Sequence, residues 1–332
     1  MTSGSRGTAV RMGVLALLWG SGFLWIKLAL NHGLSPLQIT VARCVLGAAV
    51  LLAIALASGA RLPRDRRTWG HLVVAAFLCN ALPFFLFGLG EQTVDSSVAG
   101  VLNATTPLWS LLIGIGLGTE RGLRPVRLGG LVLGFAGTLL IFAPWQRSGL
   151  FGWGALALLG AAVSYAAAFA YMGRTLTGRG TEPLALSAAQ LVTASGLSIL
   201  ALPAAGGLAP VRADATAVVA VVVLGIFGTG FTFFLNYRLI ADEGATSAAT
   251  VGYLLPVVSV ALGAVVLGEA IGPRVVLGML IVLAGVAMTR GRGRTAQEPG
   301  ARSVSGSVSV TSVSATPSVT AAVGEAVSDC RR

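Results

Sequence analysis

Two basic side chains lie within stretches of sequence that are otherwise apolar. Lys27, the only lysine of the chain, lies late in one apolar run, and Arg43 lies in the first half of the next. A charged side chain at membrane depth costs about 2.5–3.5 kcal/mol on insertion scales, so such residues usually serve a function. We expect Arg43 to face a cavity or a partner, and Lys27 either to do the same or to extend to the lipid headgroups.

Two acidic residues, Glu91 and Asp95, lie at and just beyond the end of the third apolar run. We expect Asp95 in a solvated loop, whereas Glu91 could face Lys27 or Arg43. All four charges fall toward the outer side in the topology argued below, so a carboxylate–cation pair would close an outer gate. Lys27 and Glu91 are therefore candidate gating or coupling residues. A proton is the coupling ion that Glu91 would carry, and ion-free exchange is the alternative.

Uncharged polar and aromatic residues in the middle of the apolar runs are better candidates for lining a cavity. Asn103 and Thr106 precede Pro107, and Tyr253 precedes Pro256. Both prolines remove a backbone hydrogen bond and bend a helix, either as fixed kinks or as parts of a gate. Aromatic residues with a polar tip among small residues often line wet cavities. The candidate cavity residues are Trp19, Arg43, Asn103, Thr106, Tyr165, Gln190, Asn236 and Tyr253.

The elements that must position these residues are long and apolar. Of 332 residues, 55% are hydrophobic and 11% are charged, against roughly 25% charged in a soluble domain. The mean hydropathy is +0.84, so the chain predicts an all-α integral membrane protein. A spanning helix needs about 20 apolar residues, and ten runs approach that length. They are roughly 12–31, 36–58, 70–90, 96–118, 125–143, 151–172, 183–205, 215–237, 245–268 and 272–290.

The remaining sequence features exclude several other classes of protein. The net charge of +11 does not indicate a nucleic-acid binder, because the basic residues lie in short gaps between apolar runs. The single lysine lacks the glycine pattern of a phosphate-binding loop, which excludes an ATP-driven pump in one chain. His32 and His71 lie far apart, so we expect no metal site and no cofactor. Gly130 and Gly134 form a small-xxx-small pair that we expect to pack within the bundle.

The arginines of the loops predict the orientation of the chain in the membrane. With the N-terminus in the cytoplasm, fifteen arginines fall in inside segments and three fall outside. Both termini are then cytoplasmic, which requires an even number of spans. The outside arginines are Arg147, Arg212 and Arg274.

The sequence also repeats itself about half its length apart. The stretch "TPLWSLLIGIGLGTE" at 106–120 aligns with "LPVVSVALGAVVLGE" at 255–269 at an offset of 149, and further upstream the offset is 146 or 147, so that Arg43 aligns with Gln190. Five spans in each unit force the second unit to enter the membrane from the opposite side, as in the inverted repeats of secondary transporters. We expect repeats at 1–145 and 146–292, followed at 293–332 by a disordered cytoplasmic tail.

Three motifs give a family resemblance that covers about residues 10–290. They are "LLWGSGFLWIK" (17–27), "GEQTVDSSVAGVLNATTPLWSLLIG" (90–114) and "YRLIADEGATSAATVGYLLPVVSVALGAVVLGE" (237–269). The chain resembles the drug/metabolite transporter superfamily, specifically proteins with two EamA-type domains. The resemblance implies a transporter, and similar proteins export amino acids, other metabolites or toxic compounds.

Together these features favour a secondary transporter of the cytoplasmic membrane. It would export a small metabolite, amino acid or drug-like compound by alternating access around a cavity at mid-depth, with the lipid bilayer as its surroundings. A membrane-embedded enzyme acting on lipid-linked substrates is one alternative, and a scaffold subunit without transport activity is another. The sequence indicates neither the cargo nor the oligomeric state.

Overall fold

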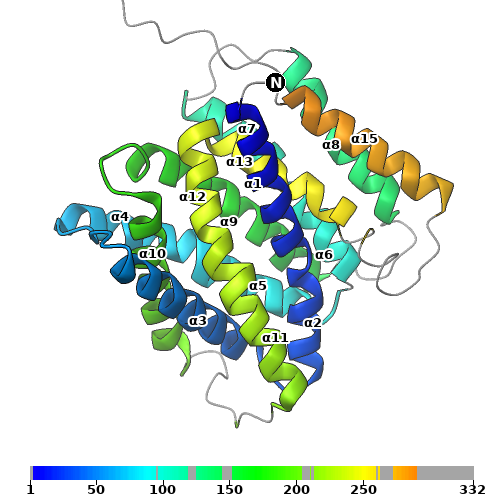
Figure 1. Ribbon diagram of the computed structural model, residues 1–332. Helices are drawn as coiled ribbons and strands as arrows, with labels where there is room; N and C mark the ends of the chain where they lie inside the picture. Colours follow the sequence, from blue (N-terminus) through cyan, green and yellow to red (C-terminus); the bar gives the residue numbers. More distant parts are fainter. Residues whose placement is uncertain are drawn as a thin grey trace, which may run out of the picture. The chain divides into compact units, whose positions relative to one another are not determined.

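A computed structural model of the chain describes residues 3–94, 96–118, 125–143, 152–203, 210, 213–258, 261 and 272–289. Helices and turns account for this part of the chain, which contains no strand (Figure 1). The helices are α1 (Ser3–Gly20), α2 (Gly22–Asn31), α3 (Pro36–Ala57), α4 (Arg66–Ala76), η1 (Phe77–Ala81), α5 (Leu82–Gly90), α6 (Ser96–Asn103), α7 (Thr106–Gly116), α8 (Pro125–Phe142), α9 (Trp153–Thr175), α10 (Pro183–Ala201), α11 (Ala215–Gly225), η3 (Ile226–Phe231), α12 (Thr232–Glu243), α13 (Ala245–Ala249), η4 (Thr250–Tyr253) and α15 (Pro273–Thr289).

Eight helical segments in the described part are long and apolar enough to cross a membrane. Two shorter apolar helices, Ala245–Val258 and Pro273–Thr289, lie where the ninth and tenth runs were expected. The all-helical membrane fold is therefore confirmed, and the count of ten spans stays a prediction. The ninth run extends into 262–271, which lies outside the described residues, as do Asp95 and the proposed tail at 293–332.

Local sequence signals set where several of these helices begin. At α3, Ser35 accepts a hydrogen bond from the Gln38 backbone while the Gln38 side chain accepts one from the Ser35 backbone, a capping box with proline in the first turn. Asp65 caps α4, and the hydroxyl and backbone N–H of Thr68 hold the pKa of that carboxyl below its usual value. Asp214 caps α11 in the same way.

Two spans contain a π-helical segment in their middle. The segment η1 joins α4 to α5, and η3 joins α11 to α12. Phe77 and Ile226, the first residues of the two segments, are separated by the 149-residue offset of the repeat. π-helical turns are rare and often lie at functional sites. Their occurrence at equivalent places in both halves therefore indicates a functional site at this depth of the bundle.

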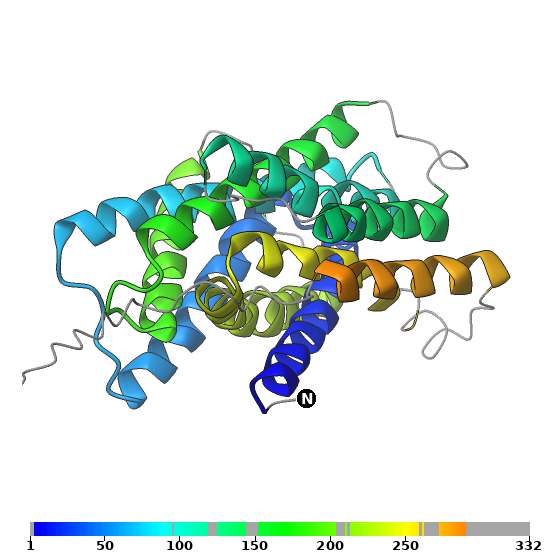
Figure 2. The ribbon, with the colours of Figure 1, turned by 90° about the horizontal axis from the view of Figure 1, so that it is seen from above.

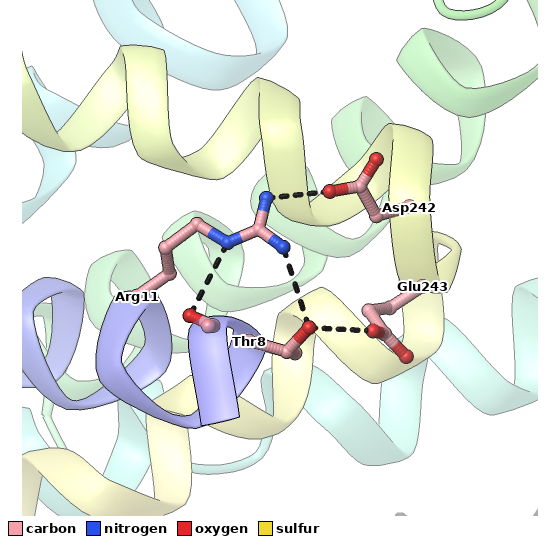
Figure 3. Close-up of polar contacts among 5 residues, drawn as sticks. Thr8, Arg11, Asp242 and Glu243 are labelled. Carbon is pink, nitrogen blue, oxygen red and sulfur yellow. Dashed lines mark hydrogen bonds and ion pairs between the residues drawn. The ribbon is translucent and has the colours of Figure 1, made fainter. Parts of the chain in front are cut away.

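The first span and the span formed by α11, η3 and α12 run antiparallel and are joined at both ends (Figures 1 and 2). At one end Arg11 Nη1 lies 2.5 Å from Asp242 Oδ2, and Thr8 Oγ1 donates a hydrogen bond of 2.9 Å to Glu243 (Figure 3). At the other end His32 Nδ1 lies 2.6 Å from Asp214 Oδ2. These contacts fix one helix of the first half beside one of the second.

Glycines bring α8 and α15 into close backbone contact (Figure 1). A Cβ atom built on Gly130 would lie 2.7 Å from the carbonyl oxygen of Gly285, and one on Gly285 would lie 2.5 Å from the nitrogen of Gly134. Any larger side chain would push these helices apart. The predicted packing role of Gly130 and Gly134 within the bundle is therefore confirmed.

Candidate functional site

A cavity lies among helices that come from both halves of the chain. It measures about 60 Å³, counted as the space open to the centres of water molecules. About 10–15 Å³ of such space holds one water, so this cavity has room for about five waters or for a small ligand. Five of the eight predicted cavity residues line it, namely Trp19, Arg43, Asn103, Thr106 and Tyr165.

Arg43 is the charged residue in the wall of this cavity, and only 6% of its surface is exposed. Its Nε donates a hydrogen bond of 3.0 Å to the hydroxyl of Thr229 in η3. That hydroxyl donates in turn to the carbonyl of Leu224, at 2.9 Å. The guanidinium carbon lies 3.5 Å from the ring centroid of Phe84, a cation–π contact. Arg43 was expected to face a cavity or a partner in the interior, and in this placement it contacts both.

Aromatic rings form a continuous wall beside Arg43. Trp19 stacks on Phe169 with ring centroids 6.4 Å apart, and Phe169 lies 6.0 Å from Tyr165. Tyr165 and Phe87 are likewise 6.0 Å apart, and Phe87 lies 5.8 Å from Phe23. All five rings line the cavity, so most of its surface is apolar.

Three predicted cavity residues, Gln190, Asn236 and Tyr253, are fully buried and do not line this cavity. Gln190 instead donates a hydrogen bond of 2.6 Å from Nε2 to Asn80 Oδ1 in η1, and its Oε1 accepts one from the hydroxyl of Tyr237. Neither amide atom of Asn236 nor the hydroxyl of Tyr253 has a hydrogen-bond partner among the described residues. The aromatic ring of Tyr253 packs against Gly134.

The two prolines predicted in the middle of spans each lie near the start of an α-helical segment. The helix α6 ends at Asn103, and α7 begins at Thr106, so Pro107 is in the first turn of α7. Proline is tolerated there because the first N–H groups of a helix have no intrahelical partner. Pro256 likewise follows the short 3₁₀ segment η4. Both prolines are buried; Pro107 follows a turn at residues 104–105, whereas Pro256 lies within the helical stretch Ala245–Val258, so the bend at each proline stays a prediction.

Lys27 and Glu91 lie together at the end of the aromatic wall. The ammonium of Lys27 donates a hydrogen bond of 2.7 Å to the backbone carbonyl of Glu91, at the C-terminal end of α5. Lys27 is half-buried and Glu91 is fully buried, so Lys27 has an interior partner. Neither residue lines the cavity. The hydrogen bond that the structure shows for Lys27 is to the backbone carbonyl of Glu91, not to its carboxylate. The carboxylate–cation gate therefore stays a prediction.

The side chains that bind Arg43 and Gln190 were not among the residues predicted from the sequence. Thr229 and Asn80, which bind Arg43 and Gln190, are separated by the same offset of 149 residues. A search for polar residues at equivalent places in the two halves would have found both. Phe84 would have been found as well, because it opens a Phe-Phe-Leu stretch that recurs at Phe233.

Comparisons with known proteins match nearly the whole described chain. A family model described as the EamA-like transporter family matches residues 9–143 and 152–291. The uncharacterized transporter YvbV of Bacillus subtilis (strain 168) is 24% identical over 283 residues, which are 85% of this chain and 90% of the relative. The uncharacterized inner membrane transporter YedA of Escherichia coli (strain K12) is 26% identical over 281 residues, or 84% and 89% of the two chains.

A solved crystal structure of a protein has a similar fold. It superposes with a TM-score of 0.69 at 22% sequence identity, over 86% of this chain and 96% of that one. At this level of identity the likeness shows the fold alone.

Proposed function

Because the chain belongs to the EamA-like transporter family, with one match in each half, we propose that it is a secondary transporter that moves a small solute by alternating access. The family and the names of its relatives indicate a multi-pass membrane transporter rather than an enzyme. One observation carries the proposal: repeat-related residues line the cavity in pairs. These pairs are Trp19 with Tyr165, Phe23 with Phe169, Asn103 with Gly252, and Thr106 with Leu255.

A cavity lined in this way lies on the boundary between two related halves. In transporters built from inverted repeats the substrate site lies at such a boundary, and rocking of one half against the other opens it to each side in turn. The contacts Arg43–Thr229 and Gln190–Asn80 support the same arrangement, since each half uses its second helix to bind the π-helical segment of the other. We propose ten spans in two inverted repeats on this basis.

The proposed orientation has both termini in the cytoplasm and the protein in the cytoplasmic membrane. It puts Arg11 and Asp242 on the cytoplasmic side and His32 and Asp214 on the outer side, which agrees with their pairing in the structure. The name of the relative YedA, an inner membrane transporter, supports the same membrane. Tags inserted near Arg64 and Arg179 should both report the cytoplasm, and tags on opposite sides would contradict the inverted arrangement.

Cysteine labelling tests alternating access directly. Ala249 lines the cavity and is 3% exposed, whereas Ala188 on α10 is fully buried outside it. In a protein whose native cysteines are replaced by alanine, we expect Ala249→Cys to react with a membrane-impermeant maleimide from either side of oriented vesicles. The matched variant Ala188→Cys should react from neither side.

A cross-link then separates alternating access from an open channel. A bifunctional maleimide that links Arg11→Cys to Asp242→Cys would hold the cytoplasmic ends of the two antiparallel spans together. We expect this cross-link to stop labelling of Ala249→Cys from the cytoplasmic side and to leave labelling from the outer side. Labelling from one side only without the cross-link, or from both sides with it, would contradict the proposal.

Reconstitution in liposomes tests the cargo, the direction and the coupling ion. Labelled amino acids, organic acids and cationic drugs would be offered with and without a pH gradient, to both vesicle orientations. We propose export, so accumulation should be faster in inside-out vesicles. Uptake of none of these solutes, together with turnover of a lipid-linked substrate, would favour a membrane-embedded enzyme.

Gating is assigned to Lys27 and Glu91 at one end of the cavity and to Pro107 and Pro256. Its support is that Lys27 joins α2 to the end of α5 and that both prolines lie beside cavity residues, Thr106 and Leu255. We expect Glu91→Gln to change the rate or the pH dependence of transport. Unchanged transport at every pH would remove Glu91 from the gate and from proton coupling.

A further inference from the structure

The cavity carries a single kind of charge. Among the described residues that line it, Arg43 is the one with a formal charge, and the others are aromatic, aliphatic, glycine, asparagine or threonine. We infer that the cavity takes a small organic anion, a carboxylate attached to an apolar body. This inference rests on the proposed transport function and names its substrate class.

The guanidinium of Arg43 keeps donors for such a ligand. It has five N–H groups, and the structure shows one of them, on Nε, bound to Thr229. Within the described part of the chain, Nη1 and Nη2 make no hydrogen bond, and neither is among the fully enclosed polar atoms that lack a partner. These two nitrogens form the planar fork that binds both oxygens of a carboxylate.

The surroundings of Arg43 hold this fork in place. The ring of Phe84 lies 3.5 Å from the guanidinium carbon and covers one face of the group, and Thr229 holds its Nε edge. A cation fixed by packing and by a hydrogen bond loses little freedom when a ligand binds, so it recognises the ligand's charge and geometry together.

The rest of the wall favours an apolar body on the anion. The rings of Trp19, Phe23 and Phe169 offer apolar surface, and Gly22 and Gly252 leave space between them. No carboxylate lines the cavity within the described residues; the charge of Glu91 acts on Arg43 from outside the lining, so a ligand's ammonium group would lie beside Arg43 with no carboxylate in the wall to bind it. A simple carboxylate therefore fits this site better than an amino acid, and much better than a cationic drug.

A matched series of ligands on purified wild-type protein tests the inference without any mutation. Benzoate, benzamide and benzylamine share one ring and differ in charge, and phenylalanine adds an ammonium group to a carboxylate. We expect calorimetric titration to show benzoate binding at least tenfold tighter than benzamide or phenylalanine, with no binding of benzylamine. Equal binding of benzoate and benzamide, or tighter binding of phenylalanine or benzylamine, would overturn the inference.

Two variants of Arg43 assign the preference to its side chain. Arg43→Gln should weaken benzoate binding more than tenfold and make it equal to benzamide binding. Arg43→Lys keeps the charge without the planar fork, so its benzoate affinity should lie between those of the wild type and Arg43→Gln. If Arg43→Gln does not fold, Arg43→Lys and the wild-type ligand series decide the outcome; a benzoate preference that survives in Arg43→Gln would overturn the inference.

The outcome is distinguishable from failure of the proposed function. Labelling of Ala249→Cys from both sides, together with no preference for benzoate, would overturn the substrate class alone. A benzoate preference in a protein whose cavity opens to one side only would overturn alternating access and keep the anion site.

Discussion

The contacts Arg43–Thr229 and Gln190–Asn80 occupy equivalent places in the two halves and differ in what they leave available. Each joins the second span of one half to the π-helical segment of the other. Gln190 uses both atoms of its amide, because Tyr237 donates to its Oε1. Arg43 binds Thr229 through one of its five N–H donors, and its side chain lines the cavity. The same scaffold therefore carries a closed structural contact in one half and an open binding group in the other.

The repeat explains part of this divergence. Tyr237, which closes the site of Gln190, has Gly88 as its counterpart at the offset of 149 residues. A glycine supplies no hydroxyl, so the contact of Arg43 with Thr229 has no third member of that kind. Arginine also brings a charge, which is costly at membrane depth unless a ligand or partner compensates it. This asymmetry indicates a structural role for Gln190 and a ligand-binding role for Arg43.

Replacing the two equivalent residues by apolar ones should give the largest contrast. Gln190→Leu leaves Asn80 Oδ1 and the Tyr237 hydroxyl buried without partners, at a cost of about 2–3 kcal/mol in total. Arg43→Met removes a buried charge and its contact with the Phe84 ring but leaves the Thr229 hydroxyl bound to Leu224, so it should cost less stability than Gln190→Leu. Thermal unfolding in detergent measures both. Equal destabilisation would mean that both contacts are structural and would break the comparison.

The two fully buried tyrosines offer a smaller and cleaner test of the closed contact. Tyr237→Phe removes the donor to Gln190 Oε1 and should cost about 1–2 kcal/mol. Tyr253→Phe is the matched control, since its hydroxyl has no hydrogen-bond partner among the described residues, and it should be neutral or stabilising. The measurement is again the unfolding midpoint. A loss of stability in Tyr253→Phe equal to that in Tyr237→Phe would show that the hydrogen bond to Gln190 contributes nothing.

Variants of Thr229 test whether its hydroxyl positions the Arg43 side chain for ligand binding. Thr229→Val keeps the shape of the side chain but removes the acceptor for Arg43 Nε, so the guanidinium loses its anchor and benzoate affinity should fall about fivefold, the equivalent of about 1 kcal/mol. Thr229→Ser should keep wild-type affinity. Thr232→Val removes a hydroxyl that binds only backbone carbonyls one turn back, and it is the matched control. Affinities that do not separate Thr229→Val from Thr232→Val would show that the anchor is not needed.

The sequence predicted the helices well and the contacts less well, for physical reasons. Hydropathy and charge depend on composition over about 20 residues, so the runs at 36–58 and 183–205 agree with α3 and α10 to within a few residues. Arg43 could be assigned to the interior because an unpaired charge in lipid is too costly. Asn236 and Tyr253 were assigned to the cavity from polarity alone, and polarity does not tell which face of a helix a residue occupies.

Side-chain partners were harder to predict because they depend on the register between distant helices. Neither the hydrogen bond from Arg43 Nε to the Thr229 hydroxyl nor the helix break before Pro107 can be predicted from the local sequence. The internal repeat was the one source of long-range information, and it relates Arg43 to Gln190 and Thr229 to Asn80. Its use on every polar residue would have identified Thr229 and Asn80 as candidates, but not the residues that they contact.

The smallest expected effect concerns a second pair of equivalent residues, the capping residues Asp65 and Asp214, which are also separated by 149 positions. Both carboxyl groups have a pKa below the usual value, Asp65 through Thr68, and Asp214 through the backbone N–H of Ala217 and then through His32 on the neighbouring span. A carboxyl whose pKa is lower in the folded state stabilises the fold above its unfolded pKa of about 3.9. That contribution is lost as the pH falls through the folded pKa.

We therefore expect the unfolding midpoint of the wild-type protein to decline as the pH falls below about 4 and through the lowered pKa values of the two carboxyl groups, and Asp214→Asn to flatten this decline more than Asp65→Asn. The reason is that Asp214 loses both its cap and its contact with His32 on protonation, whereas the contacts that lower the pKa of Asp65 come from its own helix and from Arg67 next to it. His32→Gln should reduce the difference between the two variants. Equal flattening by Asp65→Asn and Asp214→Asn would mean that the two caps contribute alike and that the contact between the spans adds nothing at this end.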